Sequence, residues 1–430
     1  MTFHDQQLNS MTSQAWKMKF LNFMTFQVFH DLYEPWIKVI FLTFFFTIFF
    51  LFIWNLSFIL SVPIVNLPGP VRMFSMTPHP HEDEEGNVYN VAVSLKKGTR
   101  YNITRVPPRP PTPRDQGEPA HPLQDVNVVS TFVPKNRLCY YHSFAMTPNY
   151  FVFIENPFIV NVWALLTMKI KGRSFHECMQ WDNKQPSRFY VIERKTGKVI
   201  ALYKTENFFS FHHVNAYETD TDIIMDVCCY PDARIVNQYY LHHLRTKPEH
   251  EISKGFPDAA LRRYRLPIPT GSTVKKTWQT LPKYSDGRDH KTLYYGVELP
   301  QINYRFANGK PYRYMYGVGP RKQGDFLNQL IKVDVLGKEA KKWHEPNCYP
   351  SEPVFVAAPG AEAEDKGVII SSVVGVRGRK SFLLVLDAST FREVARATVM
   401  CPMAHSLHGM FRPRSPAFLG QLRKAWPEAK

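Results

Sequence analysis

Residues Phe208–Glu218 read F-F-S-F-H-H-V-N-A-Y-E and place two histidines side by side inside an apolar run. Adjacent residues on an extended strand point to opposite faces, so His212 and His213 cannot easily serve the same purpose. A second apolar run, Asp222–Tyr230, follows after three polar residues. The two runs predict short strands, and they leave open which of the two histidines takes part in chemistry.

The same pattern of short apolar runs continues along most of the chain after Pro70. Short apolar or alternating runs are separated by glycine, proline, asparagine and aspartate, and few windows keep a helical period beyond two turns. Clear examples are Asn87–Val93, Tyr150–Glu155, Phe189–Glu193, Gly367–Val374 and Ser381–Asp387. This pattern predicts an all-β fold, either a sheet array, a propeller or a barrel.

The chain has 430 residues and a formal net charge of +16, but its basic residues are scattered. The densest groups, Arg262–Arg265 and Arg377–Lys380, are short and interrupted. No nucleic-acid partner is expected, because proteins that bind nucleic acid gather their cations in a stripe or a tail. Attraction to anionic phospholipid head groups fits the charge at least as well. The six cysteines form no C-x-x-C pair, which indicates free thiols in a reducing compartment.

Residues Val39–Val65 contain no charged side chain and are rich in phenylalanine. A helix of these 27 residues would be long enough to cross the roughly 30 Å hydrocarbon core of a bilayer. We therefore predict a membrane-spanning or membrane-embedded helix here; the alternative is an irregular N-terminus that the folded domain does not need. The predicted organisation is a leading segment at 1–38, the apolar segment at 39–65, a β domain at 72–415 and a tail at 416–430.

Four histidines stand in strand-like surroundings of aromatic or small residues with few cations. They are His79, His142, His212 and His408. No pair has the spacing of H-E-x-x-H, so each taken singly is better explained as an ordinary buried histidine. Taken together, four neutral imidazoles suit divalent iron and would leave the ion its charge and open positions. Spacing alone does not select them over His81, His213, His242, His243 and His405.

Two glutamates are suited to support such a centre, because ligand histidines usually need a hydrogen-bond acceptor on the second ring nitrogen. Glu298 lies in the apolar surroundings G-V-E-L-P-Q-I-N-Y, and Glu352 lies in Y-P-S-E-P-V-F-V. The alternative for each is a surface carboxylate beside a turn. The residues alone thus indicate a candidate iron centre without choosing its members.

Six short motifs occur in a fixed order between Ser75 and Phe411. They are H-P-H, Y-Y-H-S-F-x-x-T-P-N-Y, F-H-H-V-N-A-Y-E, E-L-P-Q-I-N-Y, Y-P-S-E-P-V-F-V and L-H-G-M-F. Together they resemble the carotenoid cleavage oxygenase family, specifically its animal branch of beta-carotene oxygenases and the retinal pigment epithelium isomerohydrolase. The resemblance implies a seven-bladed β-propeller with a cap of loops and helices over one end. In that fold four histidines on the propeller axis hold a non-haem ferrous iron.

Carried over motif by motif, the resemblance assigns the iron ligands. They would be His79, His142, His212 and His408. It leaves His213 as a neighbour and makes Glu298 and Glu352 two of the glutamates that orient ligand histidines. The family's third such glutamate lies upstream, on early blades, and has no counterpart in this sequence. We therefore expect an incomplete propeller and a loosened imidazole at His142, the ligand which that glutamate would orient.

The function implied by the resemblance is that of an iron(II)-dependent dioxygenase. It would cleave a conjugated double bond of a carotenoid or apocarotenoid with O2 and give aldehyde products such as retinal. Alternatives on the same fold are a retinyl ester isomerohydrolase, in which iron acts as a Lewis acid, and an inactive truncated variant that binds carotenoid. A lipophilic carotenoid or retinoid substrate fits contact with membrane lipid. We expect an intracellular, membrane-associated protein, with a single membrane span as one option.

Overall fold

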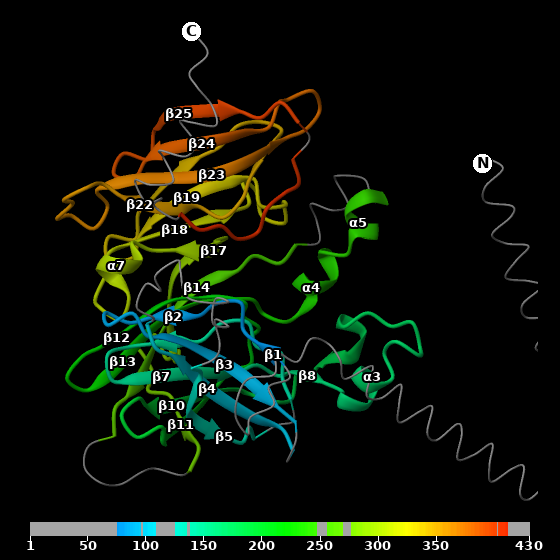
Figure 1. Cartoon of the computed structure of the whole chain (residues 1–430), viewed down its shortest axis with the longest axis vertical. Helices are drawn as coiled ribbons and strands as arrows, with labels where there is room; N and C mark the ends of the chain where they lie inside the picture. Colours follow the sequence, from blue (N-terminus) through cyan, green and yellow to red (C-terminus); the bar gives the residue numbers. More distant parts are fainter. Residues whose placement is uncertain are drawn as a thin grey trace, which may run out of the picture. The chain divides into compact units, whose positions relative to one another are not determined.

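In a computed structural model of the chain, the described residues are 75–95, 98–108, 125–135, 138–246, 256–269, 277–401 and 403–411. They all fall in one compact unit, Asn66–Lys430. The predicted leading segment at 1–38, the apolar segment at 39–65 and the tail at 416–430 lie outside the described residues. Within the described part, strands predominate and helices are few and short (Figure 1).

The described strands form five sheets of four or five strands each, which follow one another along the chain apart from one added strand. The first sheet contains β1 (Ser75–Met76), β2 (His81–Glu82), β3 (Val88–Ser94), β4 (Arg100–Val106) and β5 (Asn127–Phe132). The second contains β6 (Ala145–Met146), β7 (Tyr150–Glu155), β10 (Ser187–Glu193), β11 (Val199–Thr205) and the added strand β15 (Gln279–Thr280). Only β15 pairs in parallel among these described strands.

The remaining sheets continue the same order. The third contains β12 (His213–Glu218), β13 (Asp222–Cys229), β14 (Ala260–Pro267) and β16 (His290–Tyr295). The fourth contains β17 (Glu298–Gln301), β18 (Tyr314–Gly319), β19 (Gln329–Asp334) and β20 (Ala340–Trp343). The fifth contains β21 (Cys348–Pro350), β22 (Val354–Ala357), β23 (Gly367–Gly375), β24 (Phe382–Asp387) and β25 (Glu393–Thr398). A small separate pair joins β8 (Phe158–Val160) to β9 (Met179–Trp181).

The stretch that carries the paired histidines ends in β12, which forms a hairpin with β13. Glu218 lies opposite Ile223, and the backbone N–H of Thr219 donates to the carbonyl of Asp222 at 2.8 Å, closing the turn. A bulge interrupts the pairing within His213–Asn215. Such a bulge bends the strand and re-aims its side chains, and this one lies next to the candidate site.

Apolar side chains of neighbouring sheets pack against each other. Between the second and third sheets, one core cluster includes Val152, Phe189, Met225 and Tyr264, all fully buried. A comparable cluster joins the fourth and fifth sheets. Burial of an aliphatic or phenylalanine side chain stabilises a fold by roughly 1.5–3 kcal/mol. This packing fixes where the strand ends of one sheet lie relative to those of the next.

The helices of the described residues are short. They are α3 (Val162–Leu166), the 3-10 helix η1 (His176–Cys178), α4 (Arg234–Gln238), α5 (Leu241–Thr246) and α7 (Tyr304–Ala307). A transmembrane helix needs about 20 apolar residues, and no helix in the described ranges is long and apolar enough to cross a membrane. This finding corrects the expectation of a single-pass membrane protein. The segment 39–65, on which that expectation rested, lies outside the described residues.

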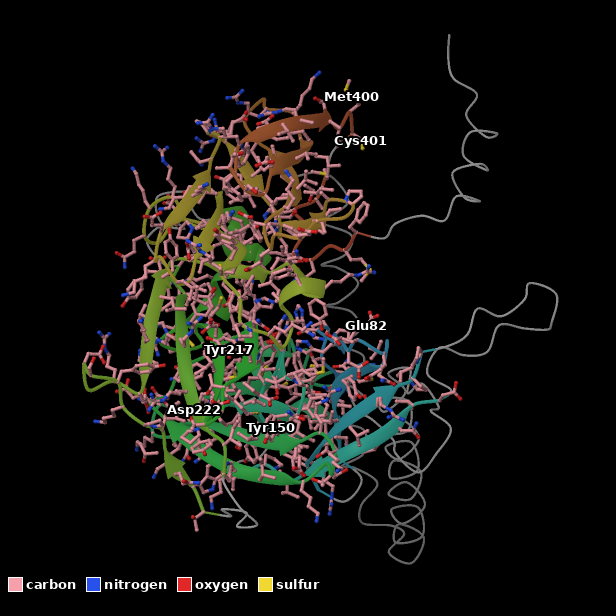
Figure 2. All side chains as sticks on the ribbon, turned by 90° about the vertical axis from the view of Figure 1, so that its left-hand side faces the viewer. Glu82, Tyr150, Tyr217, Asp222, Met400 and Cys401 are labelled. Atoms are coloured by element: carbon pink, nitrogen blue, oxygen red, sulfur yellow. The ribbon has the colours of Figure 1, made fainter. Side chains whose placement is uncertain are left out.

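The prediction of a fold built mostly from strands is confirmed. Figure 2 shows Tyr150 and Asp222, from the second and third sheets, in the lower half of the unit and Met400 and Cys401, which follow β25, at its top. The seven blades, the cap and the hydrophobic N-terminal helix stay predictions.

Candidate metal centre

Four histidines from distant parts of the chain come together at one point. His79 lies between β1 and β2, His142 lies just before β6, His212 directly precedes β12, and His408 follows β25. One potential ligand atom from each ring lies within 4.8 Å of those of the other three. The ring centroids are between 4.6 Å (His79 to His408) and 6.1 Å (His142 to His408) apart. Each histidine is held by a different strand end or loop, so sheet packing creates the cluster.

The two neighbouring histidines make different contacts. His212 is 6% exposed, and its Nδ1 lies 2.6 Å from Oε2 of Glu298. His213 instead lies with Nδ1 2.6 Å from the hydroxyl of Ser143, and its backbone N–H donates to the same oxygen at 2.9 Å. His212 belongs to the histidine cluster and His213 does not. Of the two, His212 is therefore the one positioned to bind a metal.

Glu298 begins β17 and is buried beneath His212. Its Oε2 also accepts the backbone N–H of Leu299 at 2.7 Å. Leu299 has a φ of 48°, which is rare and strained for a residue with a Cβ. The strained backbone at Leu299 therefore directs an additional N–H toward the carboxylate of Glu298.

Glu352 makes the corresponding contact with His408. Its Oε1 lies 3.1 Å from Nδ1 of His408 and accepts the side-chain amide N–H of Gln301 at 3.0 Å. Its Oε2 accepts the backbone N–H of Gly409 at 3.0 Å. Gln301 ends β17, the strand that Glu298 begins. One short strand thus supports two of the histidines, one directly and one through Glu352.

Thr77 ties together the segments that carry His79 and His142. Its hydroxyl accepts the backbone N–H of His79 at 3.0 Å and donates to the backbone carbonyl of His142. The Nδ1 atom of His142 lies 3.0 Å from the hydroxyl of Tyr140. Three of the four rings in the cluster therefore have a polar partner on Nδ1, two of them carboxylates and one a phenol.

Burial keeps two of the rings neutral. It lowers the pKa of His79 from 6.5 to about 2, and the neighbouring histidines add to this effect. It likewise lowers the pKa of His142 from 6.5 to about 3, again with a contribution from the adjacent rings. A neutral imidazole has one nitrogen with a free lone pair, whereas an imidazolium has none. Both rings can therefore act as ligands at neutral pH.

The donor set fits a divalent transition-metal ion. The Nε2 atoms of His79 and His212 are buried and have no hydrogen-bond partner among the described residues. An unpartnered buried polar atom is costly, and coordination to a cation would compensate it. Four imidazole nitrogens suit iron, zinc, copper and nickel ions, so the ligand atoms alone do not choose among these metals.

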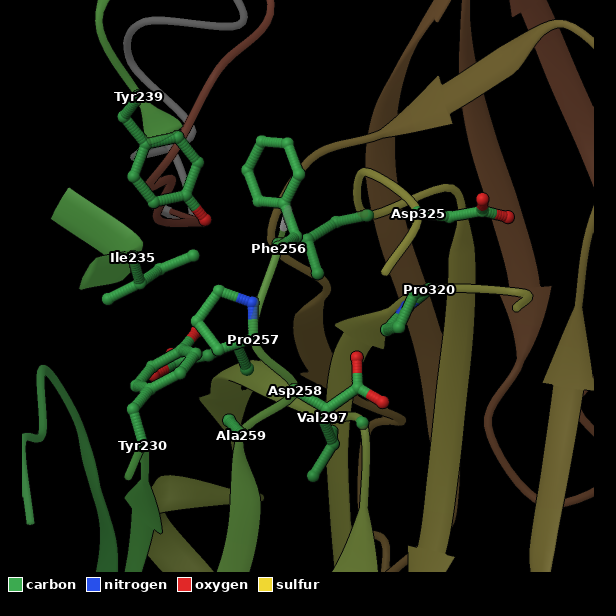
Figure 3. Close-up of a pocket in the computed structure, with 13 residues that line it drawn as sticks. Tyr230, Ile235, Tyr239, Phe256, Pro257, Asp258, Ala259, Val297, Pro320 and Asp325 are labelled. Carbon is green, nitrogen blue, oxygen red and sulfur yellow. The ribbon is translucent and has the colours of Figure 1, made fainter. Parts of the chain in front are cut away.

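Two cavities border the supporting glutamates. One, beside Glu298, has a volume of about 10 Å³, which is room for about one water molecule. Figure 3 shows its mostly apolar lining, in which Tyr230, Tyr239 and Phe256 are the aromatic members. The other, beside Glu352 and His408, has a volume of about 220 Å³ and is lined in part by Val354 and Met410. The Glu298 side of the centre is closely packed, whereas the Glu352 side borders open space.

The structure brings all six predicted site residues together. They are His79, His142, His212, His408, Glu298 and Glu352. The competing histidines His81, His213, His242 and His405 do not belong to the cluster. The residues that sequence reasoning missed are Thr77, Tyr140 and Gln301. Tyr140 and Gln301 lie within the Y-Y-H-S-F and E-L-P-Q motifs, and that position was the only signal that could have pointed to them.

Residues 61–413 match the family described as retinal pigment epithelial membrane protein. The chain belongs to this carotenoid oxygenase family. The resemblance drawn from the six motifs is thereby confirmed.

Two relatives from this family are similar to most of the chain. The carotenoid-cleaving dioxygenase, mitochondrial, of Macaca fascicularis is 39% identical over 368 residues, which cover 78% of this chain and 64% of that protein. The beta,beta-carotene 15,15'-dioxygenase of Mus musculus is 38% identical over 355 residues, covering 78% of this chain and 62% of the relative. The chain thus spans less than two thirds of the length of these relatives.

Solved structures share the fold of this family member. A variant of Synechocystis apocarotenoid oxygenase superposes with a TM-score of 0.61 at 20% identity, covering 79% of this chain and 65% of the solved one. The cobalt-substituted form of the Synechocystis enzyme gives a TM-score of 0.60, also at 20% identity. At this level of identity the likeness establishes the fold alone.

Proposed function

We propose that this chain is an iron(II)-dependent dioxygenase that cleaves a conjugated double bond of a carotenoid or apocarotenoid with O2, giving aldehydes such as retinal. The cluster of four histidines, with ligand atoms within 4.8 Å of one another, is the observation that carries the proposal. The substrate class is supported by the relatives, which are named carotenoid-cleaving and carotene dioxygenases. A dioxygenase needs a site where the metal keeps open positions, and four protein ligands leave such positions on an octahedral ion.

The proposed framework is a seven-bladed β-propeller with a cap, of which residues 72–415 form a part. Propeller blades are four-stranded sheets arranged around a central channel. The five sheets of four or five strands, placed nearly in chain order, support this arrangement. The position of the four histidines, at strand ends or loops of different sheets, is also what a shared axis would produce.

Each site residue has a proposed role. The iron would be held by His79, His142, His212 and His408. When bound, it would offer positions for O2 and act as a Lewis acid. Glu298 and Glu352 would accept the Nδ1–H groups of two of the ligand histidines, leaving the Nε2 lone pairs to the ion. These carboxylates also fix the orientation of the rings.

Aromatic rings beside the cluster suit an unsaturated hydrocarbon. The ring of Phe211 lies 5.6 Å from that of His142 and 6.1 Å from that of His212. It also packs against Phe209 at 4.7 Å and Tyr230 at 6.0 Å. Such side chains remove an apolar substrate from water and expose its double bonds to the centre. They support a polyene as the substrate.

The retinyl ester alternative is not favoured, because the relatives are named dioxygenases.

The proposed dioxygenase activity is tested by loading the purified chain with Fe(II) in the absence of oxygen and then adding β-carotene or an apocarotenoid under 18O2. We expect near-stoichiometric iron and labelled aldehyde products. His212→Asn should lose both, whereas the matched change His213→Asn, one residue away and outside the cluster, should keep both. Ester turnover without carotenoid cleavage, or carotenoid binding without iron, would contradict the proposal.

A further inference from the structure

The four rings of the cluster are supported unequally. The Nδ1 atoms of His212 and His408 lie 2.6 Å and 3.1 Å from carboxylate oxygens. The Nδ1 atom of His142 lies 3.0 Å from the hydroxyl of Tyr140. This tyrosine occupies, at the third ring, the position that a carboxylate takes at the other two.

Tyr140 is held firmly enough to orient a neighbour. Its backbone N–H donates to the carbonyl of Phe158 at 2.8 Å, and its ring packs against Phe158, Phe209 and Phe211. The ring also lies nearly parallel to that of His142, with 17° between the planes. The hydroxyl position is therefore set by backbone and by aromatic packing, independently of His142.

The protonation state of Tyr140 suits this role as well. A tyrosine phenol is neutral at physiological pH, and its oxygen can accept a hydrogen bond. When His142 uses Nε2 as a ligand, its Nδ1 carries the proton, and the Tyr140 oxygen is the acceptor within reach.

We infer that Tyr140 is a positioning residue for the metal centre: its hydroxyl oxygen accepts the Nδ1–H of His142 and directs Nε2 of that ring toward the ion. The inference rests on the proposed function. Because hydrogen bonds to ionised acceptors are about twice as strong as neutral ones, the phenol orients the imidazole with less electron donation than a carboxylate would. The ion would then hold His142 more weakly than His212 and His408, the two rings supported by carboxylates.

The test is the affinity of the full chain for Co2+, followed by visible absorption, in the parent and in Tyr140→Phe. Loss of a group that orients a ligand typically weakens metal binding by about 10–100-fold, and we expect roughly tenfold here. The matched control is Tyr141→Phe, which removes the adjacent hydroxyl; that hydroxyl bonds to Ser75 and not to a histidine. It should bind Co2+ like the parent. Thermal unfolding of the metal-free variants confirms that both fold.

A second readout is the 15N spectrum of the His142 ring with Zn2+ bound, where Tyr140→Phe should shift the Nδ1 resonance and Tyr141→Phe should leave it in place. Equal Co2+ affinity for Tyr140→Phe and the parent would overturn the inference while leaving the metal centre intact. An equal loss in both tyrosine variants would overturn it too, because any buried hydroxyl would then matter. A parent chain that binds no Co2+ would instead overturn the proposed metal centre, and this inference with it.

Discussion

The pairs His212–Glu298 and His408–Glu352 have the same chemistry in two different settings. In the first, the side chains are 8% and 4% exposed and the nitrogen-to-oxygen distance is 2.6 Å. In the second, the histidine is 33% exposed and the distance is 3.1 Å. His212 directly precedes β12 and Glu298 begins β17, whereas His408 lies in a segment without strand.

Because both pairs join a histidine to a glutamate, the difference between them comes from burial: the more buried ring has the shorter hydrogen bond. Hydrogen bonds strengthen where water is excluded, and a buried partner left alone is costly. The Glu298 side has a cavity of about 10 Å³, whereas the Glu352 side borders one of about 220 Å³ that water can enter. We therefore expect His212 to keep a fixed position in the centre and the ring of His408 to be more mobile.

The largest expected effect is that of acid on the metal-free protein, and it acts through the half-buried rings of His79 and His142. The folded-state pKa values of His79 and His142 are about 2 and 3, whereas an unfolded chain takes up these protons near 6.5. The unfolded state therefore binds more protons below pH 6.5, so stability is fully present above that pH and falls as the pH drops. The slope approaches about 1.4 kcal/mol per pH unit for each ring. Urea unfolding between about pH 7.5 and pH 5 measures it, and a flat profile would show that these rings are not buried.

Replacing the carboxylate on the closely packed side should have the next largest effect. Glu298→Ala leaves the Nδ1–H of His212 and the N–H of Leu299 buried without an acceptor. We expect the free energy of unfolding to fall by about 3 kcal/mol, since each such group costs about 1–3 kcal/mol. Metal affinity should fall by roughly 100-fold. Chemical denaturation and Co2+ titration measure the two effects, and Glu298→Gln, which keeps one acceptor oxygen, should lose less of both.

Replacing Glu352, the carboxylate on the exposed side, should reduce stability and metal affinity by less. Glu352→Ala removes the acceptor of His408, but water can reach this partly exposed ring and replace the lost bond. We expect a loss of about 1 kcal/mol in unfolding free energy and roughly tenfold in Co2+ affinity. The same two measurements apply. Losses equal to those of Glu298→Ala would contradict the expectation that the buried histidine–glutamate contact contributes more than the exposed one.

The smallest effect should come from the residue that supports Glu352. Gln301→Ala removes one donor to its carboxylate and leaves His408 and Gly409 in contact with it. We expect a loss in Co2+ affinity below about tenfold and in stability of about 0.5–1 kcal/mol. Combined with Glu352→Ala, it should add nothing further, because both changes act on one contact. If the losses of the two single variants add in the double variant, Gln301 acts through a contact other than the one with Glu352.

Some of the site could be predicted before the fold was known. Strand-like runs depend on residues that are close in sequence, and the run at Asp222–Tyr230 forms β13 almost as predicted. The family resemblance of the ordered motifs placed Glu298 and Glu352 beside two of the four histidines, and the structure shows both contacts. Tyr140 was missed because a tyrosine two residues before a histidine has no general meaning. It acquires one only when the backbone turns its hydroxyl back toward His142.

By itself, the sequence determined a fold of short strands and, through its ordered motifs, membership of a family. The residues of F-F-S-F-H-H-V-N-A-Y-E alone could not separate His212 from His213. Only the tertiary structure decided that His212 meets Glu298 and three other histidines, while His213 meets Ser143. The physical reason is that alternation along a strand is a local property. Which face meets a metal centre depends on how whole sheets pack, and that is set by side chains far away in the chain.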